Sequence, residues 1–176
     1  MYTVFFGIQC LQTKKSEYQL LIHREELKRM GMYDKATGML NRNSYDEFIK
    51  EDVTNKDRNL TCVYIDINGL HKLNNEKGHD AGDHLIETVA KSLQNNFADG
   101  KNFRAGGDEF VIILEKISIE TVEKRKEKVD REIGEYGYSV YWGIASRQGE
   151  FTNHELVQEA DKIMLNNKSQ NKSRNR

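Results

Sequence analysis

Two short apolar runs constrain the fold of this chain more than any other feature of its sequence. Residues Leu60–Ile65 and Glu109–Leu114 are rich in β-branched and aliphatic side chains, and their length is typical of buried strands rather than of helices. The second run follows a short strand candidate, Asn102–Arg104, and the glycine-containing turn Ala105–Asp108. Because a tight turn joins neighbouring strands that run in opposite directions, the pattern predicts an antiparallel hairpin within a sheet.

The segments between these strands carry apolar residues at helical spacing among many charged ones. This order of elements predicts an α+β fold of the α/β sandwich kind, in which helices flank a mainly antiparallel sheet. We expect helices from Asn43–Ser44 to about Val53, from Asn68 to Asn75, from Gly82 to Asn96, at Ile117–Tyr136 and from Thr152 or Asn153 to about Lys168, with a further strand at Tyr138–Ala145.

The first part of the chain is expected to form a separate connector. A charged helix is predicted over Lys14–Met32, and Gly31 marks its end. We therefore divide the chain into an N-terminal segment with a connector helix (1–33), one compact domain (34–172) and a short frayed basic tail (173–176). The helix lacks three sustained heptads, so it does not by itself predict a coiled-coil dimer.

Composition narrows the classes of function. The 27 basic and 28 acidic residues give a net charge of −1, whereas a general nucleic-acid binder shows a basic excess. The apolar stretch Thr3–Leu11 is too short to cross a bilayer and lacks the features of a signal peptide. Cys10 and Cys62 have neither a disulfide framework nor metal-ligand spacing, which fits a reducing cytosol. We expect a cytoplasmic protein that contacts neither nucleic acid nor membrane through this piece.

Two aspartates stand at the ends of the predicted strands. Asp66 follows the run Leu60–Ile65, and Asp108 ends the turn before the run Glu109–Leu114. If the two strands are neighbours, both carboxylates lie at one edge of the sheet, where a hard divalent cation would relieve their repulsion. Mg²⁺ prefers one or two carboxylates together with substrate phosphates, so a nucleoside triphosphate is the natural companion. Alternatively, Asp66 is a helix cap and Asp108 an ordinary turn residue.

The residues around Asp108 favour a ligand. Gly106 and Gly107 would let a bulky group approach the backbone closely, although glycine turns also occur in hairpins that bind nothing. Glu109 follows directly, and on a regular pleat it points to the opposite face from Asp108. Three roles stay open for Glu109: a second metal ligand, a proton acceptor or a solvated strand residue.

Asn74 and Asp83 together suggest recognition of guanine. A carboxylate can accept hydrogen bonds from guanine N1–H and the 2-amino group, and an amide can meet N3 or that amino group. Adenine lacks this pair of donors and would leave the charge of Asp83 unpaired. Taken singly, each residue is also compatible with a helix cap or a surface position.

Together, these residues resemble a known family, the GGDEF diguanylate cyclases. The motif that names the family is unbroken at Gly106–Phe110 and is preceded by Arg104. The resemblance extends from Asp34 to Lys172, and ordered motifs with the right gaps are far more specific than any one of them. The other segments that resemble family motifs are Asp34–Arg42 (D-x-L-T-G-L-x-N-R), Asp66–Asp83 (D-x-D-x-F/L-K-x-I-N-D-x-x-G-H-x-x-G-D), Ser139–Ala145 (S-x-G-x-A) and Ala160–Lys168 (A-D-x-A-(M/L)-Y-x-A-K).

The resemblance implies a role for each candidate site residue. Asp66 and Asp108, with the carbonyl of Ile67, would hold Mg²⁺ or Mn²⁺. Asp66, Asp108 and Glu109 would be the catalytic residues, and Glu109 would assist the metal or the attacking 3′-hydroxyl. Asn74 and Asp83 would bind guanine. The rest of the substrate site would comprise Gly69, Leu70, His71, Gly106, Gly107, Lys168 and Lys172, with Lys168 at the triphosphate.

The resemblance also implies a fold and a reaction. The expected fold is a palm-like, mostly antiparallel five-stranded sheet flanked by helices. Each domain would hold one GTP, and two domains would face each other as a homodimer and join two GTP molecules into cyclic di-GMP, releasing pyrophosphate. An upstream sensor domain is the usual partner, and this chain would then be the cytosolic part of a larger, in some cases membrane-bound, receptor.

Several positions depart from the family pattern. His71 replaces a lysine near the phosphates, and Asn171 and Lys172 replace the Gly and Arg of a G-R-N ending; lysine lacks the planar two-donor fork of arginine. The family's inhibitory R-x-x-D motif would fall at Phe97–Gly100, which does not match it, so no product-inhibition site is expected. A catalytically weak or idle domain that binds GTP and regulates an attached domain is thus the alternative function. A third hypothesis is a cyclase or polymerase of the same palm shape that makes another product.

Overall fold

The computed structural model describes residues 14–15, 18–22, 24, 31–51 and 57–174. It divides into two compact units after Tyr33, and the second, Asp34–Arg176, contains the sheet. The predicted connector helix Lys14–Met32 falls partly outside the described residues, and those of its residues that are described are helical.

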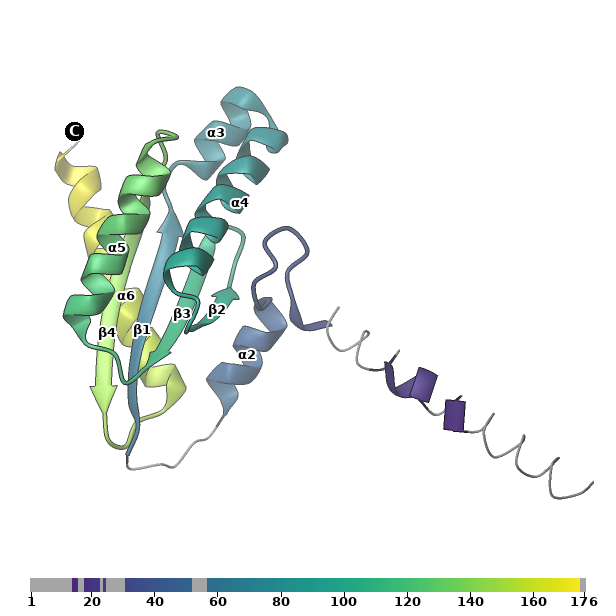
Figure 1. The fold of residues 1–176 in the computed structure, drawn as a ribbon. Helices are drawn as coiled ribbons and strands as arrows, with labels where there is room; N and C mark the ends of the chain where they lie inside the picture. The colour runs from purple at the N-terminus through teal and green to yellow at the C-terminus, as the bar shows by residue number, and fades with distance from the viewer. Residues whose placement is uncertain (1–13, 16–17, 23, 25–30, 52–56, 175–176) are drawn as a thin grey trace, which may run out of the picture. The chain divides into compact units, whose positions relative to one another are not determined.

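The second unit is built on one antiparallel sheet (Figure 1). Its strands are β1 (Asn59–Ile67), β2 (Lys101–Arg104), β3 (Glu109–Glu115) and β4 (Val140–Gln148), in the order β2-β3-β1-β4. β2 and β3 form the predicted hairpin, and β3 pairs with β1 along its whole length. The expected α+β fold with an antiparallel sheet is therefore confirmed.

The sheet has four strands in the part of the chain that the structure describes, not the five that the family resemblance implied. The segment before α2 (Arg42–Lys50) reaches β2 but pairs with it only through a parallel bridge between Leu40 and Phe103. Asn41 explains why this pairing is so short, because its side chain accepts a hydrogen bond from the Ser44 N–H and starts the helix. The chain therefore leaves the sheet after a single residue.

Helices cover both faces of the sheet (Figure 1). The helices after α2 are α3 (Leu70–Lys77), α4 (His79–Asn96), α5 (Ile119–Gly134) and α6 (Asn153–Arg174). α4 and α5 lie on one face and α2 and α6 on the other, while α3 packs against α4 beyond the end of β1. α6 continues past its predicted end at Lys168 to Arg174, so residues expected in a frayed tail are helical.

Two glycines set the bounds of the short helix α3. Gly69 before it has a φ of 76° and Gly78 after it a φ of 86°, backbone conformations that residues with a side chain rarely adopt. α3 therefore begins at Leu70 rather than at Asn68. α4 begins directly after Gly78, earlier than the predicted start at Gly82.

The side chains of β1 alternate between the two helical layers. Val63 and Ile65 are buried on the side of α4 and α5, and Cys62 and Tyr64 are buried on the side of α6. Asp66 follows Tyr64 by two residues and therefore shares the face that α6 covers. Strand alternation thus directs the first candidate carboxylate toward α6.

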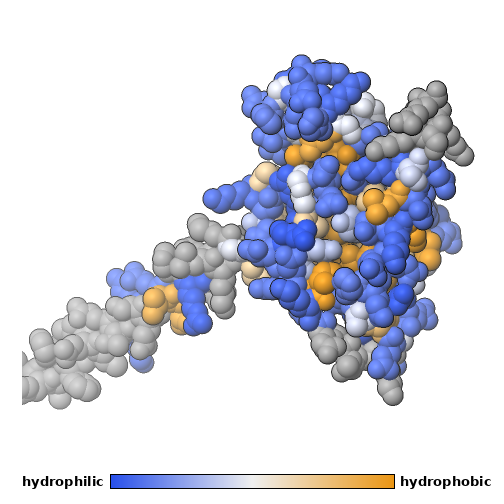
Figure 2. Space-filling view, turned by 180° about the vertical axis from the view of Figure 1, so that it is seen from behind, coloured by the Kyte–Doolittle hydropathy of each residue, from blue (hydrophilic) through white to orange (hydrophobic). Residues whose placement is uncertain are grey.

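The face of the second unit that Figure 2 shows is mainly hydrophilic. Figure 2 shows hydrophobic residues in small patches, with hydrophilic residues between them, on the side seen from behind. None of the described helices combines the length and the apolar composition that crossing a bilayer requires.

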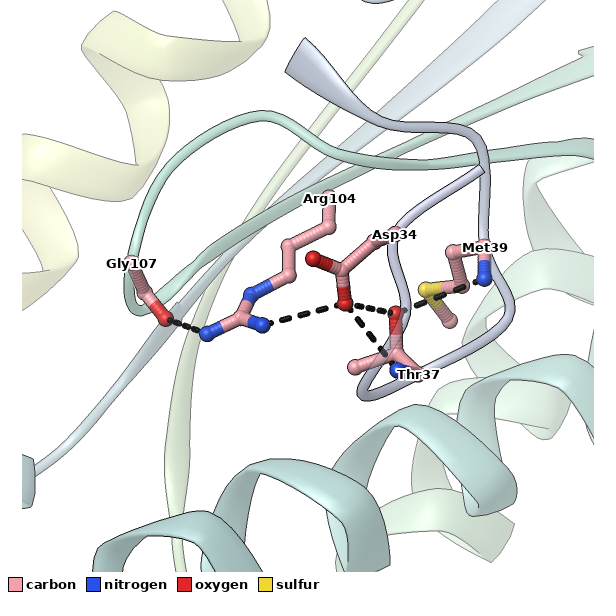
Figure 3. A network of polar contacts seen from close by, with 5 residues as sticks. All are labelled: Asp34, Thr37, Met39, Arg104 and Gly107. Atoms are coloured by element: carbon pink, nitrogen blue, oxygen red, sulfur yellow. Dashed lines mark hydrogen bonds and ion pairs between the residues drawn. The ribbon is translucent and has the colours of Figure 1, made fainter. Parts of the chain in front are cut away.

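An ion pair joins the segment before α2 to the last residue of β2, next to the turn between β2 and β3 (Figure 3). Arg104 Nη1 donates to Asp34 Oδ1 at 3.0 Å, and its Nη2 donates to the Gly107 carbonyl oxygen at 2.8 Å. The N–H and the hydroxyl of Thr37 donate to the same Asp34 oxygen at 3.0 and 2.8 Å. The turn that carries the two adjacent glycines is thereby held to the entry of the domain.

Gly143 lets α6 lie directly against β4. A Cβ atom at this position would collide with the Ala160 carbonyl oxygen and lie 2.6 Å from the Met164 nitrogen, both backbone atoms. We expect Gly143→Ala to lower the free energy of unfolding by about 3 kcal/mol, because α6 would have to move away from the sheet. Urea titration followed by circular dichroism measures this loss. Gly134→Ala is the matched control, since nothing lies within 4 Å of its Cβ position, and an equal loss there would contradict the argument.

The Asp34 network predicts a dependence of stability on acid. Burial alone would raise the pKa of Asp34, but hydrogen bonds from Thr37 and Arg104 and the charge of Arg104 bring it below its ordinary value of 3.8. A carboxylate with a lowered pKa stabilises the fold above its unfolded pKa and loses this effect as pH falls through its folded pKa. Asp34→Asn should therefore lower the free energy of unfolding by about 2 kcal/mol at neutral pH. The difference from the wild type should shrink below pH 3.8.

Chemical unfolding at a series of pH values measures this difference. The control is Asp46→Asn, which removes an exposed pair with Arg42 on α2 and should change stability by less than about 0.5 kcal/mol. A loss for Asp34→Asn that is as large in acid as at neutral pH would show that the carboxylate charge is not responsible.

Candidate active site

The end of β1 meets the start of β3 at one edge of the sheet. Asp66 in β1 lies directly opposite Glu109, the first residue of β3, and the Ile67 N–H donates to the Asp108 carbonyl oxygen at 2.9 Å. Because residues directly opposite each other share a face, Glu109 lies on the same face as Asp66. β1 also continues through Asp66 to Ile67, whereas the sequence predicted a strand that ends before the aspartate.

Lys168 on α6 forms an ion pair with Asp66. Its Nζ lies 2.7 Å from each oxygen of the Asp66 carboxylate, and the Asp66 side chain is only 6% exposed. The ring of Tyr141 flanks the same ammonium group, with its centroid 5.8 Å from Nζ. A carboxylate that accepts a cation with both oxygens has the charge and the geometry to accept a metal ion in its place.

The neighbouring acidic groups repel one another. Burial raises the pKa of Glu109, and the negative charges of Asp108 and Asp66 raise it further. Burial and then the charge of Asp66 also raise the pKa of Asp161 on α6. These shifts indicate an excess of negative charge, which a divalent cation would relieve.

The donor set fits a hard divalent cation whose shell is completed by a ligand. Among the residues that the structure describes, no three Asp, Glu, His or Cys side chains are grouped so as to hold a metal ion. Mg²⁺ commonly takes one or two carboxylates together with water and substrate phosphates, so it does not require such a group. Asp66 and Asp108, with the backbone carbonyl of Ile67, could therefore hold the ion together with phosphate oxygens.

The two adjacent glycines of the turn have different surroundings. A Cβ atom on Gly106 would lie 2.6 Å from Glu109 Oε2, so this glycine makes room for the Glu109 carboxylate. Nothing lies within 4 Å of the Cβ position of Gly107. Gly106 thus accommodates the chain's own side chain, and the space over Gly107 is open to a ligand.

The two residues expected to recognise guanine lie on neighbouring helices. Asn74 is on α3, and Asp83 is exposed near the start of α4. A Cβ atom on Gly82 would collide with Asn74 Oδ1, so the Asn74 amide packs directly on the backbone of α4. Within the described part of the chain, Asn74 Oδ1 is buried without a hydrogen-bond partner. Because a buried unpaired acceptor is unfavourable, a donor on a bound ligand would satisfy it.

The remaining candidate residues lie on α3 and α6. Gly69 and Leu70 follow β1 after Asn68, and Leu70 packs half-buried against the core. His71 is exposed, and its Nδ1 lies 3.1 Å from Asn75 Nδ2 within the same helix. Lys172 lies one helical turn after Lys168 on α6.

Two neighbours of the acidic residues were not predicted from the sequence. Tyr64 lies diagonally across from Glu109 in the register of β1 and β3, and the charge of Asp66 acts on Asp161. Strand alternation could have identified Tyr64, because residues two positions apart on a strand share a face and Tyr64 precedes Asp66 by two. Helical spacing could have identified Asp161, because it precedes Lys168 by two turns of α6 and so lies on the same side of that helix as Lys168.

Known proteins that are similar to this chain identify its family. The chain matches the family described as "Diguanylate cyclase, GGDEF domain" over residues 31–174. It is 25% identical over 155 residues to diguanylate cyclase DgcS of Shewanella oneidensis, with 82% of this chain and 52% of that protein covered. It is 31% identical over 100 residues to cyclic di-GMP phosphodiesterase PdeB of the same organism, with 56% of this chain and 11% of that protein covered. The chain thus spans about half the length of DgcS.

The fold is shared with a solved structure. The coiled coil and GGDEF domain of DgcB from Caulobacter crescentus, in complex with c-di-GMP, superposes with a TM-score of 0.82 at 20% identity. The match covers 93% of this chain and 94% of that one. From the family match over most of its length, with the motif Gly106–Phe110 at the edge of the shared sheet, we conclude that this chain belongs to the GGDEF domain family.

Proposed function

We propose that residues 34–172 form a diguanylate cyclase domain, which condenses two GTP molecules into cyclic di-GMP and releases pyrophosphate. The observation that carries this proposal is the opposition of Asp66 and Glu109 across β1 and β3, beside Asp108 and the open backbone of Gly107. Membership in the GGDEF domain family supports the same reaction.

The proposed cofactor is Mg²⁺ or Mn²⁺, held by Asp66, Asp108 and the Ile67 carbonyl. When bound, the ion would neutralise charge on the triphosphate and activate the attacking hydroxyl. The ion pair between Lys168 and Asp66 supports this assignment, because it holds a positive charge against the same carboxylate. Lys168 would exchange that carboxylate for phosphate oxygens when GTP and the ion are present.

The chain's own residues would orient GTP along the edge of the sheet. Gly106 and Gly107 would let the phosphates approach the turn, and Lys168 and Lys172 would supply positive charge from α6. Gly69 precedes α3, and Leu70 and His71 lie in its first turn, where backbone N–H groups without helical partners would favour an anion. Asn74 and Asp83 would accept and orient guanine, and the unpaired Asn74 Oδ1 supports a ligand donor at this point.

The reaction would join two opposed substrates. Each 3′-hydroxyl oxygen would attack the α-phosphorus of the GTP on the facing domain, and the bond from that phosphorus to the oxygen bridging to the β-phosphate would break. Pyrophosphate would leave, and Glu109 would accept the proton of the hydroxyl, since its raised pKa favours this role. The second, identical step would close the ring.

A homodimer follows from this chemistry, because one domain would hold one GTP and positioning both hydroxyls requires two facing sites. Since the chain spans about half the length of DgcS, we propose that a sensor domain elsewhere in a longer protein controls this pairing. We also propose that the domain works in the cytosol, where GTP is available.

The alternative is a catalytically weak or idle domain that binds GTP and regulates an attached domain. His71 bonds within α3, where the family pattern has a lysine, and the relative PdeB is named as a phosphodiesterase rather than a cyclase. The acidic residues Asp66, Asp108 and Glu109 are all retained, which favours an active cyclase.

We propose further that this domain lacks the family's product-inhibition site. Phe97 stands at the first position of the R-x-x-D motif and is fully buried. Gly100 stands at the last, and a Cβ atom there would lie 2.9 Å from Ile112 Cγ2. Asp99 between them is already paired with Arg125, at 2.5 Å. No arginine is therefore available at the first position to hold the product.

The function is tested by incubating the purified chain with GTP and Mg²⁺ and identifying the products by mass spectrometry. We expect cyclic di-GMP and pyrophosphate from GTP, none from ATP, and a loss of about a hundredfold or more in Asp108→Ala. Added cyclic di-GMP should not inhibit noncompetitively. GTP binding without product would favour the idle domain, and a different nucleotide product would contradict the proposal.

The metal site is tested without turnover. Lys168→Met leaves the buried Asp66 carboxylate without its cation, so we expect it to lower the free energy of unfolding by about 3 kcal/mol in metal-free buffer. Mg²⁺ should then raise the melting temperature of this variant more than that of the wild type. The reason is that the ion would neutralise the Asp66 carboxylate, whose charge Lys168 no longer balances. Differential scanning calorimetry with and without Mg²⁺ measures both effects. Lys124→Ala, on the exposed face of α5, is the control, and an equal response to Mg²⁺ in all three proteins would refute the site.

A further inference from the structure

The turn between β2 and β3 carries Asp108, and its shape decides where this carboxylate lies. The N–H groups of Ala105 and Gly106 both donate to the Glu109 carbonyl oxygen, at 2.9 and 3.2 Å. Gly107 separates these two bonds from Asp108, and a glycine has more backbone freedom than any other residue. The direction in which the chain reaches Asp108 therefore depends on side chains that bind the turn.

Two arginine side chains hold carbonyl groups of this turn. Arg42, the first residue of α2, donates from Nη1 to the Ala105 carbonyl oxygen at 2.6 Å. Arg104 Nη2 donates to the Gly107 carbonyl oxygen at 2.8 Å (Figure 3). A peptide group is planar, so a held carbonyl also fixes the N–H group of the next residue. The two arginines thereby fix the first and the last peptide group of the turn Ala105–Asp108.

The guanidinium group of Arg42 is itself held in place. Its Nε pairs with Asp46, one turn later on α2, at 3.0 Å, and its Cζ lies 5.2 Å from the centroid of the Tyr45 ring. Asn41 caps α2 directly before Arg42 and so fixes where this side chain starts. The Arg42 side chain is nevertheless 60% exposed, so replacing it should leave the hydrophobic core intact.

We propose that Arg42 is a positioning residue, whose guanidinium group holds the Ala105 carbonyl and so keeps Asp108 where it would meet the ion. The inference deepens the proposed cyclase function, on which its kinetic consequence rests, whereas the hold on the turn does not depend on that function. Arg42 would contact neither the nucleotide nor the ion. Arg104 supports the same turn but also binds Asp34, so Arg42 is the better position at which to measure the hold.

Hydrogen exchange measured by NMR tests the hold on the turn. The Ala105 and Gly106 amides are bonded across the turn, so their exchange reports its local opening. In Arg42→Met we expect both to exchange about tenfold faster relative to the Val63 amide in the middle of β1, as for the loss of a hydrogen bond to a charged group. Unchanged exchange of these two amides would refute the proposal.

Kinetics of the same variant test the consequence for the reaction. At saturating GTP and Mg²⁺ we expect kcat for cyclic di-GMP formation to fall about tenfold, because a displaced turn misplaces Asp108. The KM for GTP should stay unchanged, since Asn74 and Asp83 would bind guanine on other helices. A wild-type kcat would contradict the positioning role. So would a loss confined to KM, which would place Arg42 on the nucleotide instead.

The matched control is Arg58→Met. Arg58 likewise donates to a backbone carbonyl, that of Phe151 at 2.7 Å, and its Cζ lies 4.6 Å from the centroid of the Phe151 ring. It directly precedes β1, whereas Asp66 lies near the other end of this strand. The control should keep the wild-type kcat and the wild-type exchange of the turn amides. Equal effects in both variants would show that the contact at Ala105 has no special role.

The two measurements separate this inference from the proposed function. If the wild type makes no cyclic di-GMP, the proposed function is wrong, and hydrogen exchange still decides whether Arg42 holds the turn. If the wild type is active and the turn amides of Arg42→Met exchange as in the wild type, the positioning role is wrong and the cyclase function stands.

Discussion

Backbone pairing between β1 and β3 holds Asp66 opposite Glu109, and the candidate site takes its shape from this register. Because side chains alternate along a strand, a slip of one residue would turn Asp66 toward α4 and α5 and put an apolar residue under α6. Both faces of β1 are buried, by Val63 and Ile65 on one side and by Tyr64 on the other, so the apolar packing itself opposes such a slip. The position of the acidic residues is therefore a consequence of core packing.

This register concentrates negative charge, and the fold compensates for it in two ways. α6 brings the ammonium group of Lys168 to Asp66, and the lack of a side chain at Gly106 leaves room for the Glu109 carboxylate. Each of these contacts comes from a different part of the chain. The free protein is thereby stable with its acidic groups close together, and a bound cation would replace or relieve contacts that already exist.

Local patterns were enough to predict most of the architecture. The apolar run Leu60–Ile65 and the turn Ala105–Asp108 predicted a central strand and a hairpin, because strand composition and turn chemistry are properties of adjacent residues. Element bounds were less accurate where a single cap decides them, as at Asn41 before α2 and Gly69 before α3. The fifth strand implied by the family resemblance was wrong for the described residues, since capping ends the pairing of Leu40.

The site was predictable in its motifs but not in its contacts. The sequence identified Asp66, Asp108 and Glu109 as candidates, because acidic residues next to strands and glycines carry a recognisable chemistry. It did not reveal that Lys168 pairs with Asp66. The two residues are 102 positions apart, and the packing of α6 against the sheet brings them together. The position of Glu109 directly opposite Asp66 likewise depends on strand register, which a single sequence does not state.

The close approach of α6 to β4 at Gly143 links packing to charge. Gly143 faces Ala160 and Met164, and Met164 precedes Lys168 by about one helical turn. The height of the helix above the sheet therefore sets how near the ammonium group comes to Asp66. Substitutions at the contact between Gly143, Ala160 and Met164 would therefore change the distance between Lys168 and Asp66. The electrostatic balance of the site could change in this way while every acidic residue stays the same.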